Sequence, residues 1–177
     1  MSEVYLKKAK KTPETGTSET RKIVERMLSE IEIGKEKIAK KYASDLDGFN
    51  GDIIVSQESI ENASKMVPEK LKDDIKFAHE RIKKFAEAQK QSINEFETEL
   101  SPGLWAGQKL IPIQTAGCYV PGGRYAHVAS AIMSITTARV AGVENIIACS
   151  APKGEDGPNP AILYTMNYCG ADKILAL

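Results

Sequence analysis

The sequence predicts an α/β protein: an N-terminal helical region followed by half of a Rossmann-like parallel sheet (βαβαβ), incomplete at the C-terminus. Residues 1–100 carry 39 of the 48 charged side chains, which is typical of exposed amphipathic helices. Residues 101–177 carry 9 of the 13 glycines and few charges, which is typical of a covered parallel sheet. Strand and helix patterns also alternate in this second half. We therefore expect two regions, 1–100 and 101–177, within one 19.3 kDa chain.

The first helices are predicted from apolar spacing. Thr17 or Ser18 can cap a helix whose apolar residues follow the 3.6-residue period. Gly34 interrupts that stripe, and a second helical stripe continues to the turn at Asp47-Gly48. The spacing thus predicts two helices joined near Gly34.

A longer helix is expected before residue 101. A short extended piece at residues 53–55 leads to Ser56, a cap for a helix that ends near residue 66. Pro68 suits the first turn of a helix that continues to about residue 97. Such a helix exceeds the usual globular length, so we expect it to pack across a domain or a partner subunit. His79 lies within it and is expected to be solvated.

The second half alternates between strands and helices. The predicted order is a strand at residues 116–120, a helix at 126–140, a strand at 145–149, a helix at 161–169 and a strand at 173–177. This order means parallel pairing with right-handed crossovers. The boundary with the helical region falls near Ser101-Pro102-Gly103, and Trp105 is expected to anchor the link.

Composition excludes several functions. The 24 basic residues cancel the 24 acidic ones, so a generic binder of nucleic acid or anionic membranes is not expected. No apolar run approaches a membrane span, and Met1-Ser2-Glu3 does not begin a signal peptide. Cys118, Cys149 and Cys169 are far apart and odd in number, so we expect reduced, packed thiols in a cytoplasmic protein.

A glycine turn is the candidate ligand site. Tyr119 and Val120 end the first predicted strand, and Pro121-Gly122-Gly123 then lead into a helix. In α/β sheets, ligands bind at the carboxyl ends of strands, and backbone N–H groups free of side-chain bulk can face an anion. The pattern is not G-x-G-x-x-G, so the usual dinucleotide fingerprint is absent. A bound ligand and a purely structural turn both remain open, and spacing alone names no ligand.

Three residues after the turn are candidate substrate contacts. Arg124 could pair with a sulfonate, carboxylate or pyrophosphate, or be an ordinary surface arginine. Tyr125 could stack or hydrogen-bond. His127 could meet a substrate or phosphate, or simply begin a helix. His79 and His127 are the only histidines, and we find no set of three ligands for a catalytic zinc.

The motifs resemble one enzyme family. The turn Gly117-Cys118-Tyr119-Val120-Pro121-Gly122-Gly123, the stretch Thr137-Ala138-Arg139-Val140-Ala141-Gly142-Val143 and the stretch Cys169-Gly170-Ala171-Asp172-Lys173 are similar to the histidinol dehydrogenase family. The likeness covers nearly the whole chain. The details Arg124-Tyr125-Ala126-His127 and Gly103-Leu104-Trp105-Ala106-Gly107 look closer to the sulfopropanediol dehydrogenase branch.

The resemblance implies a zinc-requiring, NAD-dependent alcohol dehydrogenase. Such enzymes oxidise an alcohol to an acid in two hydride transfers to NAD. Residues 101–177 would be the first part of an NAD-binding domain, with Tyr119, Pro121, Gly122 and Gly123 at the cofactor. The substrate would be a small alcohol, for which we favour a sulfonated diol, and the enzyme would be a homodimer.

The family's zinc ligands and its Glu-His pair lie beyond Leu177. We therefore expect the chain to be a portion of a larger dehydrogenase, with no catalytic residue of its own and no activity alone. Two alternatives remain: a non-catalytic nucleotide-binding or dimerisation module, and a structural protein without a ligand.

Overall fold

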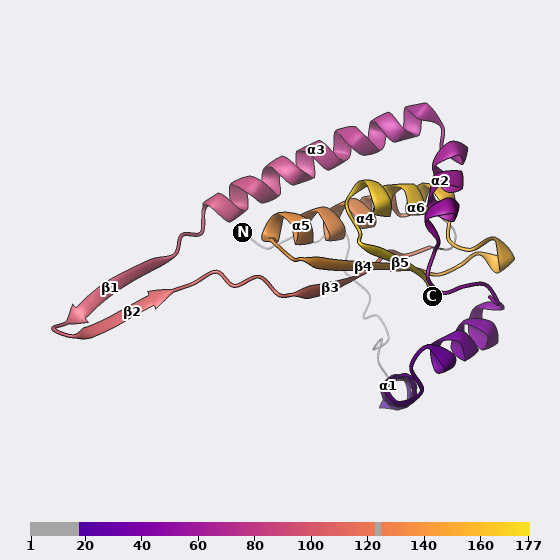
Figure 1. Ribbon diagram of the computed structural model, residues 1–177, viewed down its shortest axis with the longest axis horizontal. Coiled ribbons are helices and arrows are strands. Elements are labelled where there is room, and N and C mark those ends of the chain that lie inside the picture. The colour runs from indigo at the N-terminus through magenta and orange to yellow at the C-terminus, as the bar shows by residue number, and fades with distance from the viewer. Residues whose placement is uncertain (1–17, 123–124) are drawn as a thin grey trace, which may run out of the picture. The chain divides into compact units, whose positions relative to one another are not determined.

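The computed structural model describes residues 18–122 and 125–177 (Figure 1). The chain divides into two units, Met1–Lys41 and Tyr42–Leu177. Helix α1 (Ser18–Asp47) crosses this division, and its backbone leaves the helical region at Lys35, with φ 52° and ψ −140°. The interruption predicted at Gly34 is thus confirmed within one residue.

The second unit is built on a three-stranded parallel sheet. Its strands are β3 (Thr115–Tyr119), β4 (Asn145–Ser150) and β5 (Lys173–Ala176), in the spatial order β3-β4-β5. All three predicted strands are confirmed within about one residue at each end. Residues 53–55 lie beside β5, where the Val55 N–H donates to the Ile174 carbonyl over 3.0 Å. The βαβαβ order and parallel pairing establish the predicted α/β fold.

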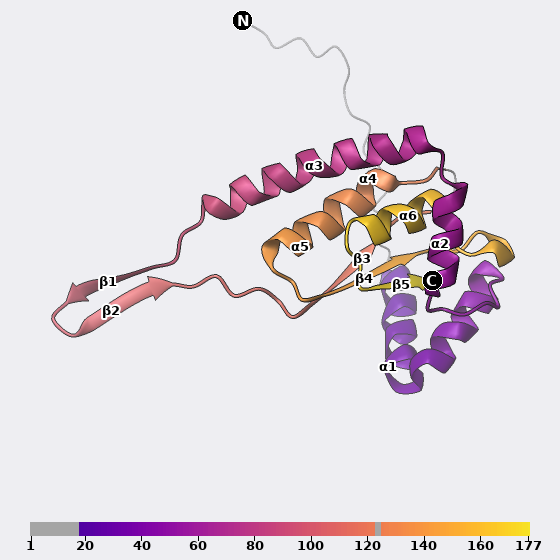
Figure 2. The ribbon, with the colours of Figure 1, turned by 45° about the horizontal axis from the view of Figure 1, so that its top comes forward.

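Helices cover one face of this sheet (Figures 1 and 2). They are α2 (Gln57–Met66), α3 (Glu69–Gln91), α4 (Val128–Ala131) with the π-helical turn η1 (Ile132–Thr136) and α5 (Thr137–Ala141), and α6 (Pro160–Tyr168). Ile135 of η1, Ile146 of β4 and Ile162 of α6 are fully buried in the shared core. The sheet's other face is exposed or half-buried. Because strand side chains alternate, each strand presents one residue in two to the helices.

Local sequence sets the helix ends. Ser56 caps α2, since its hydroxyl accepts from the Ser59 N–H over 3.1 Å, as predicted. Asn159 caps α6 through the Ala161 N–H over 2.9 Å. Gly142 and Gly170 follow α5 and α6 with φ of 97° and 95°, a conformation that favours glycine. A short 3-10 turn, η2 (Gly154–Asp156), lies between β4 and α6.

The long predicted helix is wrong in its last turns. Helix α3 ends at Gln91, and the chain then forms an antiparallel hairpin of β1 (Phe96–Ser101) and β2 (Leu104–Gln108). Figures 1 and 2 show this hairpin running away from the helices and the parallel sheet. The expected region boundary near residue 101 falls in the hairpin turn. Trp105 lies on β2 and is 56% exposed, so it does not anchor a packed link.

His79 is also placed differently from the prediction. Its ring meets Tyr168 of α6 edge-on, with ring centroids 5.1 Å apart, and its Nδ1 is buried without a hydrogen-bond partner in the described residues. Burial lowers the pKa of this imidazole. His79 is therefore a packing residue between α3 and α6 and not a solvated one. None of the helices in the described ranges is long and apolar enough to cross a membrane.

Candidate functional site

The predicted cofactor residues lie where the parallel strands have their carboxyl ends, which we call the carboxyl edge of the sheet. The β3–β4 ladder extends one residue beyond β3, where the Val120 N–H donates to the Cys149 carbonyl over 2.7 Å. Cys118 and Val120 point into the core, whereas Tyr119 is 62% exposed. The alternation of the strand thus presents the Tyr119 ring to solvent where the strand ends, in a position open to a ligand.

Gly122 brings the turn against the end of β4. A β-carbon added to Gly122 would stand 3.2 Å from the Ala151 carbonyl oxygen and 3.4 Å from the Ser150 hydroxyl. Glycine therefore allows the backbone to approach a neighbouring strand closely. Ser150 is fully buried, and its hydroxyl finds no hydrogen-bond partner within residues 18–122 and 125–177. The close approach to Ala151 is a structural reason for the glycine, whereas a buried hydroxyl without a described partner leaves a hydrogen-bonding group to be explained.

The other predicted site residues fall into two groups. Gly123 and Arg124 lie outside the described residues. Tyr125, which is 74% exposed, and His127 follow the turn and reach solvent. His127 immediately precedes α4, but its side chain does not cap that helix. The structure therefore groups Tyr119, Pro121 and Gly122 at the edge and leaves Tyr125 and His127 beside the helix start.

The sequence predicts packed thiols at all three cysteines; this is only partly right for Cys149 and is confirmed for Cys118 and Cys169. Both are buried, at 6% and 4% exposure. Cys149 lies on the opposite face of the sheet, is half-buried and donates its thiol hydrogen to the Leu177 carbonyl over 3.2 Å. Burial raises the pKa of the Cys149 thiol, so it stays protonated near neutral pH. A protonated, hydrogen-bonded thiol is a poor nucleophile.

The opposite edge of the sheet, where the strands have their amino ends (the amino edge), holds a polar cluster that spacing along the sequence does not predict. Arg139 of α5 donates to the carbonyls of Val143 and Glu144 over 3.1 and 3.0 Å, and to the Gly170 carbonyl over 2.5 Å. It also pairs with the Asp172 carboxylate over 2.7 Å. These bonds tie the end of α5 to the segments that begin β4 and β5. Arg139 and Asp172 belong to the two motifs quoted for the family, so the motifs were visible but their joint role was not.

Asp172 has a second partner in this cluster. Its carboxylate accepts the Ile146 backbone N–H over 2.7 Å. This backbone hydrogen bond, and then the Arg139 guanidinium, hold the pKa of Asp172 below its usual range. With every hydrogen bond directed at a neighbouring element, the Arg139–Asp172 cluster is a structural clamp.

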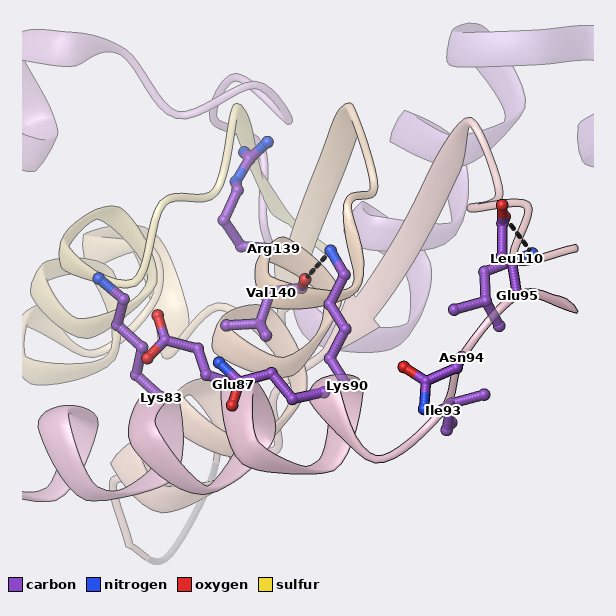
Figure 3. Close-up of a pocket in the computed structure, with 10 residues that line it drawn as sticks. Lys83, Glu87, Lys90, Ile93, Asn94, Glu95, Leu110, Arg139 and Val140 are labelled. Atoms are coloured by element: carbon purple, nitrogen blue, oxygen red, sulfur yellow. Dashed lines mark hydrogen bonds between the residues drawn. The ribbon is translucent and has the colours of Figure 1, made fainter.

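Two hollows lie near the amino edge. One is a cavity of about 680 Å³, whose lining residues are drawn in Figure 3. At this cavity Lys90 of α3 donates to the Val140 carbonyl over 2.9 Å, and the Leu110 N–H donates to Glu95 over 2.8 Å. A neighbouring apolar hollow of about 840 Å³ lies over β3 and is lined by Ala116 and Ile113 among others. Neither hollow reaches Tyr119 or Gly122, so the candidate cofactor edge and the hollows are separate features.

No metal site is built from the residues that the structure describes. In those two ranges, no three His, Cys, Asp or Glu side chains lie close enough to hold a metal ion. A zinc ion that requires three protein ligands therefore does not fit the described residues. At the carboxyl edge, the exposed Tyr119 ring offers a flat surface on which a nucleotide could stack.

Comparison with known proteins gives the family. The family model described as histidinol dehydrogenase matches residues 10–177, nearly the whole chain. The chain belongs to the histidinol dehydrogenase family. It is 54% identical over its whole length to a histidinol dehydrogenase homolog of Pelagibacter ubique, of which it covers 42%. It is 50% identical over 98% of its length to the sulfopropanediol 3-dehydrogenase of Ruegeria pomeroyi, of which it covers 40%.

A solved structure has the same fold. The crystal structure of histidinol dehydrogenase from Elizabethkingia anophelis superposes on 93% of this chain with a TM-score of 0.84 and 31% sequence identity. The chain covers 38% of that protein. It therefore spans about two fifths of the length of the relatives that it matches, while keeping their fold in that part.

Proposed function

We propose that this chain forms the N-terminal part of an NAD-dependent, zinc-requiring alcohol dehydrogenase and contributes the first half of its NAD site. The observation that carries the proposal is the exposed Tyr119 ring beside the close-approaching Gly122 at the carboxyl edge of a parallel sheet. Family membership supports the oxidoreductase class. Membership alone would not choose which edge of the sheet binds the cofactor.

The chain's own residues would bind and orient the cofactor. The Tyr119 ring offers a flat apolar surface and a hydroxyl, and Pro121, Gly122 and Gly123 would line the cofactor with a backbone that carries little side-chain bulk. NAD, when bound, supplies the hydride acceptor. The packed thiols of Cys149 and Cys169 take no part, because burial keeps both protonated.

The substrate we propose is a small alcohol that carries an anionic group, with a sulfonated diol favoured over histidinol. The identity of 50% to a sulfopropanediol 3-dehydrogenase, against 31% to a solved histidinol dehydrogenase, supports this choice. Arg124, Tyr125 and His127 are the proposed substrate contacts, because they follow the cofactor turn directly. A guanidinium would pair with the sulfonate.

Catalysis needs groups that the described residues do not provide. We propose that the zinc ligands and the acid–base pair come from residues of a longer polypeptide, that the enzyme is a cytoplasmic homodimer, and that this chain alone binds NAD without oxidising an alcohol. NAD binding by this chain can be tested apart from the other two proposals, because cofactor binding needs no zinc.

A calorimetric titration with NAD tests the cofactor proposal. The full 177-residue chain should bind NAD, and Tyr119→Ala should weaken binding about tenfold because it removes the ring contact. Phe85→Ala is the matched control, since Phe85 on α3 is equally exposed, at 63% against 62%. A second titration of the NAD complex should detect sulfopropanediol and not histidinol. Absence of NAD binding, or equal effects of both substitutions, would contradict the proposal.

A further inference from the structure

His79 lies on the face of α3 that packs against the core. Ile75, four residues before it, is buried, and Ile82, three residues after it, packs against the same core cluster. Residues at this spacing share one face of a helix. The half-buried imidazole is turned the same way, because its Nδ1 is buried and its ring meets the Tyr168 ring of α6. A titratable side chain therefore lies in a row of apolar ones.

The neighbouring helices offer no carboxylate to a protonated His79. Helices α4 and α6 and the turn η1 contain no charged residue. The one charged residue of α5 is Arg139, a cation that is already bonded to Gly170 and Asp172 at the amino edge. The charged residues of α2 are all exposed: Glu58, Glu61 and Lys65. An imidazolium at this position would thus lack an ion-pair partner from another helix.

Helix α3 itself also disfavours a proton on His79. Lys83, four residues after His79, shares its face of the helix and carries a positive charge. Lys76, three residues before it, is another cation, paired with Asp73 over 3.3 Å. Glu80 is the adjacent residue, and adjacent residues of a helix do not face each other. The nearest charges on the face of His79 are therefore positive.

Two ring contacts join α3 to α6. His79 meets Tyr168 edge-on, with ring centroids 5.1 Å apart, and the Lys72 ammonium lies 5.8 Å from the centroid of the Tyr164 ring. Tyr164 and Tyr168 stack on each other with their centroids 5.9 Å apart, so the two contacts form one cluster. We call these four side chains the α3–α6 contact. Its geometry depends on the His79 ring staying against Tyr168.

We propose that the α3–α6 contact is pH-sensitive: it is stable while His79 is neutral and weakens when His79 takes up a proton. Burying a neutral ring with one unpaired nitrogen costs less than burying a charge. An imidazolium needs an acceptor at both nitrogens, and the buried Nδ1 has none among residues 18–122 and 125–177. The protonated ring is therefore more stable turned out to solvent, away from Tyr168.

The sign of the pH dependence follows from the same groups. Burial lowers the pKa of His79, while Glu80 opposes this shift and Lys83 adds to it. With the folded-state pKa below that of the unfolded chain, the stability is complete above about pH 6.5 and is lost as the pH falls through the folded pKa. One proton changes the unfolding equilibrium constant by at most about tenfold per pH unit. We therefore expect α3 to loosen from α6 in mildly acidic solution.

Proton NMR of the full chain tests the protonation directly, because the sequence contains only two histidines. The imidazole signal that persists in His127→Phe belongs to His79. In the folded wild-type chain this signal should titrate below the ordinary value of about 6.5, and in urea it should titrate near that value. In Tyr168→Ala, where water reaches the imidazole, the midpoint should move back toward about 6.5.

Urea unfolding measures the effect on stability. As the pH falls from about 7.5 to about 5.5, the unfolding equilibrium constant of wild type should rise about threefold or more relative to that of His79→Phe. This variant keeps a ring against Tyr168 that cannot take up a proton. His127→Phe is the matched control, because His127 is exposed, and it should keep the pH dependence of wild type.

Three results would overturn the proposal. A His79 signal that titrates at or above about 6.5 in the folded chain would mean that the Tyr168 ring stabilises the imidazolium. The same pH dependence of stability in wild type and His79→Phe would mean that protonation does not weaken the contact. Loss of that dependence in His127→Phe would assign it to the other histidine. None of these measurements involves NAD, so they are independent of the cofactor proposal.

Discussion

The amino and carboxyl edges of the β3-β4-β5 sheet differ in how completely their polar groups are hydrogen-bonded. At the amino edge, the Arg139 guanidinium has four acceptors, and Asp172 accepts from both Arg139 and the Ile146 N–H. At the carboxyl edge, Ser150 is buried without a described partner and the Tyr119 ring lies in solvent. A region whose groups are all satisfied internally stabilises the fold. A region with an unsatisfied hydroxyl and an exposed ring has groups that can still bind a ligand.

The largest expected effect is at the amino edge. Arg139→Gln should lower the free energy of unfolding by about 2–3 kcal/mol, because it leaves part-buried carbonyl groups at the ends of strands and helices without their charged donor. Urea unfolding measures this loss. NAD affinity should not change, and a change as large as that of Tyr119→Ala would show that the two edges are not independent.

Gly122→Ala should have the next largest effect, now on the ligand. Its β-carbon would press on the Ala151 carbonyl at 3.2 Å and push the turn outward. We expect NAD affinity to fall about tenfold and stability by about 1 kcal/mol. Gly117→Ala on β3 is the control, because a β-carbon there meets nothing within 4 Å. Equal NAD affinity for Gly122→Ala and wild type would show that this turn is not part of the NAD site.

Asp172→Asn should cost about 1 kcal/mol at pH 7, since the side chain is partly exposed and asparagine keeps one acceptor. The folded-state pKa of Asp172 lies below its usual value, so its contribution is present above about pH 4 and is lost as pH falls through the folded pKa. The melting temperatures of the wild-type chain and of the Asp172→Asn variant should therefore converge as the pH is lowered below about 4. Glu144→Gln, which changes a nearby exposed carboxylate, should show no such convergence. A difference in melting temperature that stays constant as the pH falls would contradict the assignment.

Ser150→Ala should change stability least, and it should stabilise the protein where the other substitutions destabilise it. Removing a buried hydroxyl that lacks a described partner should raise the free energy of unfolding by about 0.5–1 kcal/mol. Calorimetric melting without NAD measures it. A loss of stability would show that the hydroxyl is satisfied in the free protein and would weaken the contrast between the edges.

Much of the fold follows from short-range patterns. The cap at Ser56 and the βαβαβ order depend on spacing and on turn residues near in sequence, and all were predictable. The end of α3 was not, because Ile93 continues the helical apolar spacing and no glycine or proline appears before Pro102. The Pro102-Gly103 pair therefore predicts a boundary between regions, whereas in the structure it closes the hairpin of β1 and β2.

The sequence predicts those features of the candidate site that depend on a single segment of the chain, and not those formed by contacts between distant segments. The Tyr119 exposure and the core position of Cys118 follow from strand alternation. Arg139, by contrast, meets Gly170 and Asp172 across 31 and 33 residues, and no local pattern shows that contact. Nor could the sequence show that Ser150 is buried beside Gly122, because one residue ends β4 and the other follows β3.

We propose that the amino edge of the sheet stabilises the fold and that the carboxyl edge binds NAD. The decisive experiment is calorimetric melting of the wild-type chain, Arg139→Gln and Tyr119→Ala, each without NAD and with NAD at about ten times the wild-type Kd. We expect Arg139→Gln to melt at lower temperature than wild type but to keep the full NAD-dependent shift in melting temperature. Tyr119→Ala should melt like wild type without NAD and lose most of that shift. A shift that survives in Tyr119→Ala, or disappears in Arg139→Gln, would contradict it.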